Sequence, residues 1–391
     1  MTVQDNSSKQ KPKVAILHAF FKGDCKGGGE KLIFEIRDYY KADLYTGAID
    51  LDSWSIENHP NDSFVKRLWD DRFKFTYLHK DSHIPVWKHI KRQLFFLFSP
   101  NIKELENYDV VIFSGNIGNV TWRLGKPKKI LYCHTTPRPF TDQMPTTLSK
   151  FHPIVHPIVK FFARIVVNRY IEDCNNTDLI ISNSQNIHDR LKEFTGIESD
   201  IIYPAVDTTR FNYITTGDYY LSYARLEEIK RIKLIVETFE NLPSEKLVIC
   251  SGGPLKQWII EEIKSKNLNN ITYEGLVSDE RLAELVGGCR AGIYIPVNED
   301  AGITQIELMA AGKPVIGVDE GALPSTVLDN KTGIIIPANP TMDDLTKAIL
   351  TLDTDKASSM KEECREWALN FDSKVFFEAM DSKIEELLVR N

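Results

Sequence analysis

Short apolar runs alternate with helical patterns along most of the chain, and this alternation constrains the fold more than any other feature. The runs are rich in β-branched and aromatic residues, as buried strands are. The twelve expected strands cover residues 13–20, 41–47, 109–115, 128–134, 177–184, 199–206, 219–225, 246–253, 270–275, 291–297, 313–318 and 332–337. Stretches between them, such as 230–242, have apolar positions at helical spacing. Regular strand–helix alternation predicts an α/β fold with parallel, doubly wound sheets.

The length of the chain indicates two domains. A chain of 391 residues is long for a single domain, and half of the expected strands precede residue 207. We therefore predict two Rossmann-like domains that face each other across a cleft. The first covers residues 1–206 and the second covers 207–372, with the polar segment 207–218 as the linker. A last amphipathic helix is expected over 373–390.

The two halves of the chain differ in charge. Residues 1–200 hold 28 Lys and Arg against 24 Asp and Glu, whereas residues 201–391 hold 20 against 31. All nine histidines precede residue 189. This difference supports two domains with different partners.

The composition argues against several classes of protein. No apolar run is long enough for a transmembrane helix, and the polar stretch MTVQDNSSKQKPK lacks the apolar core of a signal peptide. The six cysteines are scattered without a CxxC pair, so neither a disulfide framework nor a zinc site is expected. We predict a cytoplasmic protein with no nucleic-acid partner.

The stretch NEDAGITQIELMAAG (298–312) is the most informative local pattern. It follows the expected strand 291–297, so Glu299 lies in a turn that leaves a strand, and Glu307 lies early in a helix. Gly302 allows the backbone to approach a ligand closely. Amides and carboxylates together suit a ligand that carries both phosphates and hydroxyls, such as a sugar nucleotide. A capped helix with a solvated face is the ordinary alternative.

Two further turns of the second half have the same setting. Arg225 ends an expected strand and Lys230 opens the next helix, which would suit a diphosphate. CSGGP (250–254) places glycines between a strand and a helix. Each has an ordinary interpretation by itself, a solvated cation pair and a common strand-to-helix turn. All three turns follow strands of one domain, and together they favour a single bound nucleoside diphosphate.

These motifs resemble the retaining glycosyltransferases of family 4, which have the GT-B fold. The similar features of the second half are R-x4-K at Arg225 and Lys230, GLVSDERLAELV (275–286), E-x7-E at Glu299 and Glu307, and AAGKPVIGVDEGALPSTV (310–327). The first half adds GGGEK (27–31), CHTTPR (133–138), IISNSQNIHDRL (180–191) and YPAVDTTRF (203–211). NEDAGITQIE is closest to the form found in bacterial mannosyltransferases of O-antigen and exopolysaccharide assembly.

The resemblance implies roles for residues of the second half. Arg225 and Lys230 would bind the donor diphosphate, Glu307 the ribose hydroxyls and Glu299 a hydroxyl of the transferred sugar. The backbone at Gly302 and Ile303 would hold sugar and phosphate, and the backbone near Val277 would contact the base. The chain departs from the family at Ala301, where the family usually has an aromatic residue.

The resemblance also implies roles in the first half. His134 would contact the sugar near the anomeric centre, although an ordinary structural role for this histidine stays open. Gly28 and Gly29 would close over the phosphates. The C-terminal helix would cross back to the first domain, which places residues 373–391 there. Arg138 and the more positive first half would suit a lipid-linked pyrophosphate acceptor.

The expected reaction needs no cofactor and no metal. Arg225, Lys230 and backbone amides would stabilise the leaving diphosphate, and the family retains anomeric configuration without a metal. The acidic pairs Asp50/Asp52 and Asp353/Asp355 lie in polar segments away from the motifs, and solvated carboxylates are the favoured interpretation of both.

Two other segments have residue patterns that could form a site. VWKHIKRQLFFLF (86–98) combines Lys and Arg with bulky apolar residues, so it would suit an anionic membrane surface or, equally, a core-facing helix. HPIVHP (152–157) has the spacing of a metal pair, but its prolines disrupt a regular helix, and we predict that it packs.

The most specific function that these features imply is a retaining hexosyltransferase. It would move mannose from GDP-mannose to a glycan or lipid-linked glycan in cell-surface polysaccharide assembly, with at most a peripheral contact to the inner face of the membrane. A UDP-sugar donor, a GT-B epimerase and a non-catalytic sugar-nucleotide-binding subunit stay open, whereas nothing in the sequence signals the lysine-bound pyridoxal phosphate that a phosphorylase needs. A NAD-dependent dehydrogenase is disfavoured, because HAFFKGDCKGGGEK (18–31) does not fit G-x-G-x-x-G.

Overall fold

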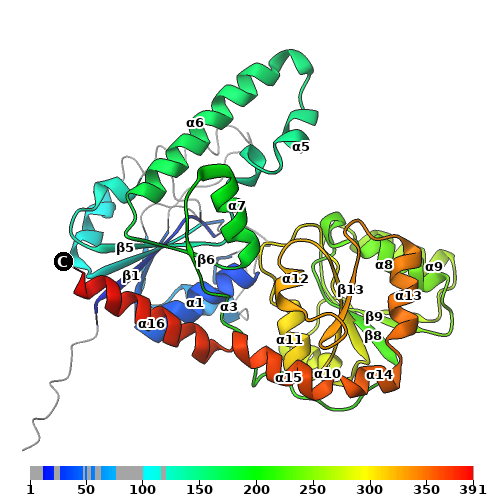
Figure 1. The fold of residues 1–391 in the computed structure, drawn as a ribbon. Helices are drawn as coiled ribbons and strands as arrows, with labels where there is room; N and C mark the ends of the chain where they lie inside the picture. Colours follow the sequence, from blue (N-terminus) through cyan, green and yellow to red (C-terminus); the bar gives the residue numbers. More distant parts are fainter. Residues whose placement is uncertain are drawn as a thin grey trace, which may run out of the picture. The chain divides into compact units, whose positions relative to one another are not determined.

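The computed structural model describes residues 12–21, 27–46, 49–50, 54–57, 63–75, 100–115 and 120–390. The chain forms two compact units (Figure 1). Unit 1 comprises Met1–Asn183, Ile187–Ile201 and Asp381–Asn391, and unit 2 comprises Ser184–Asn186 and Ile202–Met380. Within the described ranges, no helix is both long enough and apolar enough to cross a bilayer.

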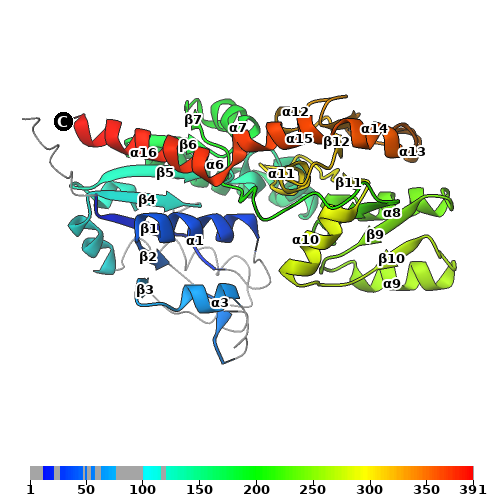
Figure 2. The ribbon, with the colours of Figure 1, turned by 90° about the horizontal axis from the view of Figure 1, so that it is seen from below.

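Unit 1 contains a seven-stranded parallel sheet in the order β3-β2-β1-β4-β5-β6-β7. Its strands are β1 (Val14–His18), β2 (Asp43–Thr46), β3 (Phe73–Phe75), β4 (Val110–Ser114), β5 (Lys128–Cys133), β6 (Leu179–Ser182) and β7 (Asp200–Ile201). Figure 2 shows this order along the sheet. Sequence order reverses between β1 and β4, the position at which doubly wound sheets bind ligands.

The helical segments of unit 1 are α1 (Gly28–Tyr40), α3 (Ser63–Leu68), η1 (Pro100–Asn107), η2 (Thr121–Arg123), η3 (Arg138–Phe140), α5 (Met144–Ser149), η4 (Pro153–Val155), α6 (His156–Asn175) and α7 (Gln185–Thr195). Helices α1 and α7 lie on opposite faces of the sheet (Figure 1). The sequence explains how α1 begins, because the Glu30 carboxylate accepts the Gly27 N–H at 3.1 Å. Leu32, Ile33 and Ile36 form its buried face.

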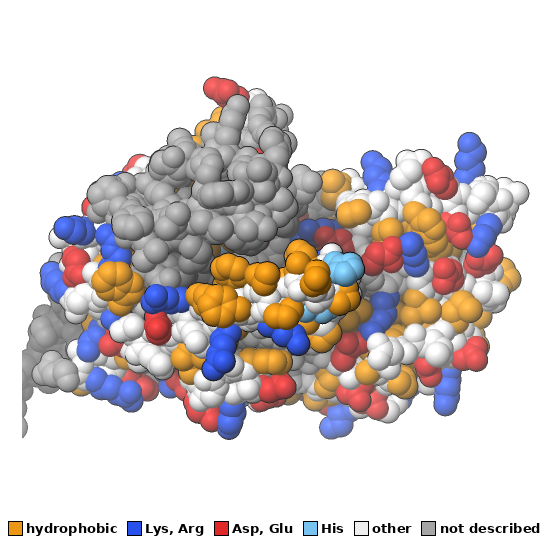
Figure 3. Space-filling view, turned by 90° about the horizontal axis from the view of Figure 1, so that it is seen from above, with side chains coloured by type: hydrophobic (Ala, Val, Ile, Leu, Met, Phe, Trp, Pro, Cys, Tyr) orange, Lys and Arg blue, Asp and Glu red, His pale blue; other side chains and the backbone are white. Residues whose placement is uncertain are grey.

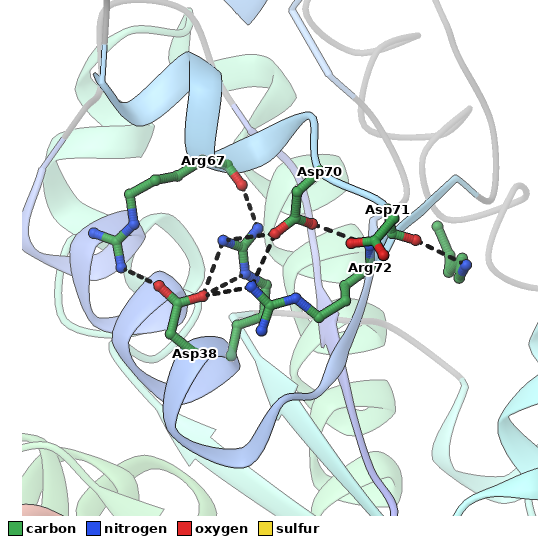
Figure 4. A network of polar contacts seen from close by, with 7 residues as sticks. Asp38, Arg67, Asp70, Asp71 and Arg72 are labelled. Atoms are coloured by element: carbon green, nitrogen blue, oxygen red, sulfur yellow. Dashed lines mark hydrogen bonds and ion pairs between the residues drawn. The ribbon is translucent and has the colours of Figure 1, made fainter.

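Strand β3 was not predicted, and an ionic network connects this edge of the unit to α1. Arg37 is buried and pairs with Asp38 and Asp70, at 3.0 and 3.2 Å (Figure 4). Arg72 contacts the same two carboxylates, at 3.1 and 3.0 Å. Burial opposes the charge on Asp38, but Arg67 and Arg37 outweigh it and lower the pKa of this carboxyl. The short edge strand pairs with β2, and this network links the residues just before it, Asp70 and Arg72, to α1.

Unit 2 contains a six-stranded parallel sheet in the order β10-β9-β8-β11-β12-β13. Its strands are β8 (Tyr219–Ser222), β9 (Lys246–Ile249), β10 (Ile271–Tyr273), β11 (Ala291–Ile293), β12 (Val315–Val318) and β13 (Gly333–Ile336). The order reverses between β8 and β11. Both sheets therefore confirm the predicted α/β, doubly wound class, and each of the twelve predicted ranges contains a strand.

The helical segments of unit 2 also cover both faces of its sheet (Figure 1). They are η5 (Glu228–Lys230), α8 (Ile232–Glu240), α9 (Lys256–Ser265), α10 (Asp279–Gly288), α11 (Thr304–Ala310), α12 (Leu323–Thr326), α13 (Met342–Thr351), α14 (Thr354–Ser359), α15 (Lys361–Ala368) and η6 (Leu369–Phe371). The segment 207–218 is not a free linker, because Phe211 lies in the core of this unit.

The last helix, α16 (Ser373–Val389), is divided between the units. Its residues up to Met380 belong to unit 2, and those from Asp381 belong to unit 1. In unit 1 the hydroxyls of Tyr39 and Tyr40 donate to Asp381 at 2.6 and 2.8 Å. Lys383 forms an ion pair with Asp200 at 2.7 Å. The last turns of the chain thus complete the unit that its first residues begin.

Candidate functional site

The loops that follow four neighbouring strands of unit 2 form the first candidate region. Because the sheet is parallel, the carboxyl ends of β8, β9, β10 and β11 lie at one edge, beside the reversal in strand order. Seven of the predicted donor-site residues follow these strands: Arg225 and Lys230 after β8, Val277 after β10, and Glu299, Gly302, Ile303 and Glu307 after β11. The fold therefore gathers this predicted set at one edge.

Lys230 and Glu299 are in direct contact, although the sequence suggested separate roles for them. The Lys230 ammonium donates to Glu299 Oε2 at 2.5 Å and to the Tyr294 hydroxyl at 3.3 Å. Both charged side chains are largely buried, at 15% and 18% exposure. Burial and the Glu299 carboxylate raise the pKa of Tyr294, so its hydroxyl stays protonated. A cation, a carboxylate and a phenol therefore form one cluster at the mouth of the β11 loop.

Glu307 is a buried carboxylate in the first turn of α11. Its Oε2 accepts the hydroxyl of Tyr223 at 3.0 Å, and the same hydroxyl lies 3.0 Å from the Thr304 carbonyl. Burial, followed by the charge of Glu307, raises the pKa of Tyr223. Tyr223 therefore holds the carboxylate in one orientation, and a carboxylate retains capacity for further hydrogen bonds from a ligand. The sequence analysis did not single out Tyr223.

Two glycines explain how the loop around Glu299 can form. Gly302 and Gly321 both have left-handed backbone angles, with φ of +68° and +64°. A Cβ at Gly321 would also collide with the backbone of Glu299. Gln305 is fully buried and donates to the Ala301 carbonyl at 3.0 Å and to the Gly302 carbonyl at 3.3 Å. Backbone and side chain together fix the loop that presents Glu299.

A second ion pair fixes the other end of the same loop. Arg231 has a left-handed backbone, with φ of 51°, which is costly for a residue with a side chain. Its guanidinium donates to the Ile295 carbonyl at 2.9 Å and to Glu320 at 2.5 Å. The other oxygen of Glu320 accepts the Asn298 N–H at 3.0 Å. Arg231 and Glu320 therefore connect the segment after β8 to the loop after β11.

The remaining predicted donor-site residues of unit 2 are less enclosed. Arg225 is 42% exposed and pairs with Glu227 at 3.0 Å. Val277 is half-buried and packs against the core, whereas Leu276 beside it is exposed. Gly253 lies where any Cβ would collide with the backbone of Leu226, so the CSGGP turn does require close backbone approach. The backbone that Gly253 approaches is therefore that of Leu226, within the protein itself.

Unit 1 contains a second candidate region, also at its reversal in strand order. His134 follows β5, and its Nε2 lies 2.9 Å from the Ser114 hydroxyl at the end of β4. The same hydroxyl lies 3.0 Å from Nδ1 of His18, at the end of β1. Burial, helped by His134, lowers the pKa of His18 to about 3. Ser114 and His18 thus hold His134 in place, and sequence reasoning missed both because they come from separate strands.

The predicted glycines of unit 1 lie beside this chain of side chains. Gly28 and Gly29 open α1, and a Cβ at Gly29 would lie 3.9 Å from Nδ1 of His134. Arg138 is largely buried and pairs with Asp142 at 3.0 Å. It is therefore part of an ion pair within unit 1.

Several other predictions can be compared with the structure. The prediction that HPIVHP packs is wrong: Ile154 is 78% exposed, because the turn before α6 stands away from the core.

Of the two acidic pairs, Asp353 caps α14, because its carboxylate accepts the Lys356 N–H. In the parts of the chain that the structure describes, no three His, Cys, Asp or Glu side chains gather as a metal site requires. The predicted membrane segment 86–98 and Asp52 lie outside the described residues.

Comparison with known families decides the assignment. The profile described as "Glycosyl transferases group 1" matches residues 209–370, and that described as "Glycosyltransferase Family 4" matches residues 63–210. The chain belongs to the family 4 glycosyltransferases. Together the two matches run from residue 63 to residue 370 and include parts of both units.

Proteins similar to this glycosyltransferase in sequence agree with its family, and solved structures of other proteins agree with its GT-B fold. It is 26% identical over 305 residues to alpha-1,3/1,6-mannosyltransferase ALG2 of Dictyostelium discoideum, covering 66% of this chain and 69% of that protein. It is 30% identical over 132 residues to the O-antigen chain mannosyltransferase C of Escherichia coli, covering 32% and 34%. Anabaena Alr3699/HepE, solved with UDP-glucose, superposes with a TM-score of 0.70 at 14% identity, covering 95% and 99%. Sucrose-phosphate synthase of Thermosynechococcus elongatus gives 0.74 at 16%, covering 97% and 100%.

Replacing Glu320 tests whether the pair with Arg231 stabilises unit 2. In Glu320→Ala the guanidinium loses its carboxylate and the Asn298 N–H loses its acceptor. We expect the free energy of unfolding to fall by about 1–3 kcal/mol, measured by chemical denaturation. Asp218→Ala, which removes an exposed pair with Lys246, is the matched control and should have a much smaller effect. Equal effects of the two substitutions would contradict the stabilising role.

His18 should make the stability of unit 1 depend on pH. Its folded pKa of about 3 lies below the usual 6.5, so the unfolded chain binds the proton first as pH falls. The stabilising effect is complete above about pH 6.5 and is lost progressively below it. Between about pH 7.5 and pH 5 the free energy of unfolding should fall by about 2 kcal/mol more than in His18→Asn, whose amide can still bond Ser114. Denaturation curves that shift equally in both proteins would refute this.

Proposed function

We propose that this glycosyltransferase moves a mannosyl group from GDP-mannose to a glycan or a lipid-linked glycan, with retention of anomeric configuration. The observation that carries the proposal is the cluster of Lys230, Glu299 and Tyr294 beside Glu307, at the reversal in strand order of unit 2. Its relatives include mannosyltransferases, one of them described as GDP-mannose-dependent, at 29% identity over 152 residues. The contrasting candidate is a UDP-sugar donor, because a similar fold was solved with UDP-glucose.

The cation of the cluster suits departure of a nucleoside diphosphate. Negative charge develops on the leaving phosphate, and Lys230 lies in a largely buried site where its charge acts strongly. A diphosphate would compete with Glu299 for this ammonium, so binding should loosen the pair seen in the structure. Arg225, which is more exposed, would add a second cation. We infer that these side chains replace a divalent metal and that no cofactor takes part.

The carboxylates would bind different parts of the donor. Glu307, held by Tyr223, would accept the ribose hydroxyls, and Glu299 would accept a hydroxyl of the transferred sugar. The backbone at Gly302 and Ile303 would hold sugar and phosphate, and that near Val277 would contact the base.

In unit 1, His134 would contact the sugar near the anomeric centre, fixed by its hydrogen bond to Ser114. Gly28 and Gly29 would close over the phosphates, and Arg138 would favour an acceptor with a phosphate group. Synthesis of cell-surface polysaccharide on the cytoplasmic side of the membrane is the setting that this donor and acceptor suggest.

The two glutamates should separate binding from turnover. Glu307→Ala removes contacts that do not change during transfer, so it should raise the Michaelis constant and weaken GDP binding by roughly ten- to a hundredfold. Glu299→Gln should mainly lower turnover, by a similar factor, and it should not weaken GDP binding, because it removes the carboxylate that competes with the diphosphate for Lys230. Transfer assays measure the Michaelis constant and the turnover, and GDP titrations measure the affinity for GDP. The control is Glu284→Ala, which removes an exposed ion pair with Arg281 on α10. Parental behaviour of both variants would reject the site.

Donor choice and metal dependence can be tested together. We expect GDP and GDP-mannose to raise the melting temperature more than UDP and UDP-glucose, because a ligand that binds only the folded state stabilises it. The shift should persist in excess chelator. A larger shift with UDP-glucose would favour the contrasting donor, and loss of the shift on chelation would overturn the metal-free proposal.

A further inference from the structure

The hairpin formed by α5, η4 and the first half of α6 exposes an unusual number of large apolar side chains. Six of them are 42% to 78% exposed: Phe151, Ile154, Ile158, Phe161, Phe162 and Ile165. Figure 1 shows α5 and the start of α6 projecting from unit 1, and Figure 3 shows hydrophobic side chains gathered over this part of the surface. Scattered exposed apolar residues are normal in proteins, but a contiguous group of this kind marks an interaction surface.

The other half of α6 shows that the hairpin is firmly attached. Tyr170, Asp173 and Cys174 are buried, and Asp173 Oδ1 accepts the Thr121 hydroxyl at 2.9 Å. In the first half of the helix only Ala163 is buried. The helix is therefore fixed at its carboxyl end and carries its apolar residues out from the core. A rigid projection can present these side chains at a surface without unfolding.

The charge of the same segment is strongly biased. Residues 143–171 contain no Asp or Glu, although the whole chain has 55 in 391 residues, and they contain Lys150, Lys160, Arg164 and Arg169. Arg169 pairs with Glu172 at 2.7 Å. For Lys150, Lys160 and Arg164, the described residues provide no ion-pair partner. Figure 3 shows Lys and Arg side chains beside the apolar group and His at one end of it.

We propose that this surface, residues 144–165, binds an anionic lipid bilayer. A helix that projects apolar side chains between lysines and arginines lies in the interface of a membrane, with the apolar groups among the acyl chains and the cations at the lipid phosphates. The charge argues against a second copy of the chain, because an isologous contact would bring the three unpaired cations against their own equivalents. This inference does not depend on the donor or on the transfer reaction.

Vesicle binding tests the proposal with the full-length protein. We expect co-sedimentation with vesicles of phosphatidylglycerol and phosphatidylcholine, and at least tenfold weaker binding to phosphatidylcholine alone or at high salt. Replacing Ile158, Phe161 and Phe162 by Ser should weaken binding at least tenfold. Because these side chains are exposed, the melting temperature should be unchanged. Leu350→Ser with Leu369→Ser, which removes equally exposed apolar groups from unit 2, is the matched control and should bind like the parent.

The cations are tested separately. Replacing Lys150, Lys160 and Arg164 by Ser should remove most of the preference for anionic vesicles. Replacing the exposed Lys264, Lys331 and Lys347 of unit 2 should leave it unchanged. The proposal is overturned if the parent does not bind anionic vesicles or if the hairpin variants bind like their controls. It is also overturned if sedimentation velocity shows a dimer that the Phe161 and Phe162 changes abolish, because the apolar surface would then contact a second copy.

Discussion

The common direction of the strands is the constraint on which the other features of this molecule depend. In a parallel sheet every strand ends at the same edge, so the strand order alone brings residues that are far apart in sequence together there. Where the strand order reverses, the neighbouring loops diverge and leave room for a ligand. This happens between β1 and β4 in unit 1 and between β8 and β11 in unit 2. His18, Ser114 and His134 meet at the first position, and Lys230 and Glu299 at the second.

Much of this architecture could be predicted, because the apolar residues that a buried strand requires are neighbours in the sequence. Runs such as VVIFS and VIGV are apolar on both faces, which a strand covered by helices on both sides requires. Strand β3 has only the residues FKF, and the ion pair that links Asp70 near it to Arg37 of α1 is not revealed by any local pattern. The prediction that HPIVHP packs within the protein is wrong for a related reason. Apolar residues indicate that some surface covers them, but they do not show whether that surface belongs to the same protein.

The site was predictable in position but not in its contacts. Motif spacing located Lys230, Glu299 and Glu307, yet it could not show that Lys230 and Glu299 form an ion pair. Nor could it find Arg231 and Glu320, which are 89 residues apart and meet through tertiary structure. Side chains that orient others do so through contacts that form only in the folded chain, so no local sequence pattern identifies them. Tyr223 and Tyr294 are the nearest exceptions, since each lies inside a predicted strand range and directly follows an observed strand, β8 or β11.

The division of α16 has a consequence for the order in which the chain can fold during synthesis. Asp381 bonds to Tyr39 and Tyr40, more than 340 residues earlier in the chain. The ribosome therefore makes all of unit 2 before it makes the segment that completes unit 1. Domains are usually expected to fold in the order of their synthesis. Here unit 1 begins first, yet the contacts between Asp381 and its helix α1 can form only after the whole of unit 2 has been made.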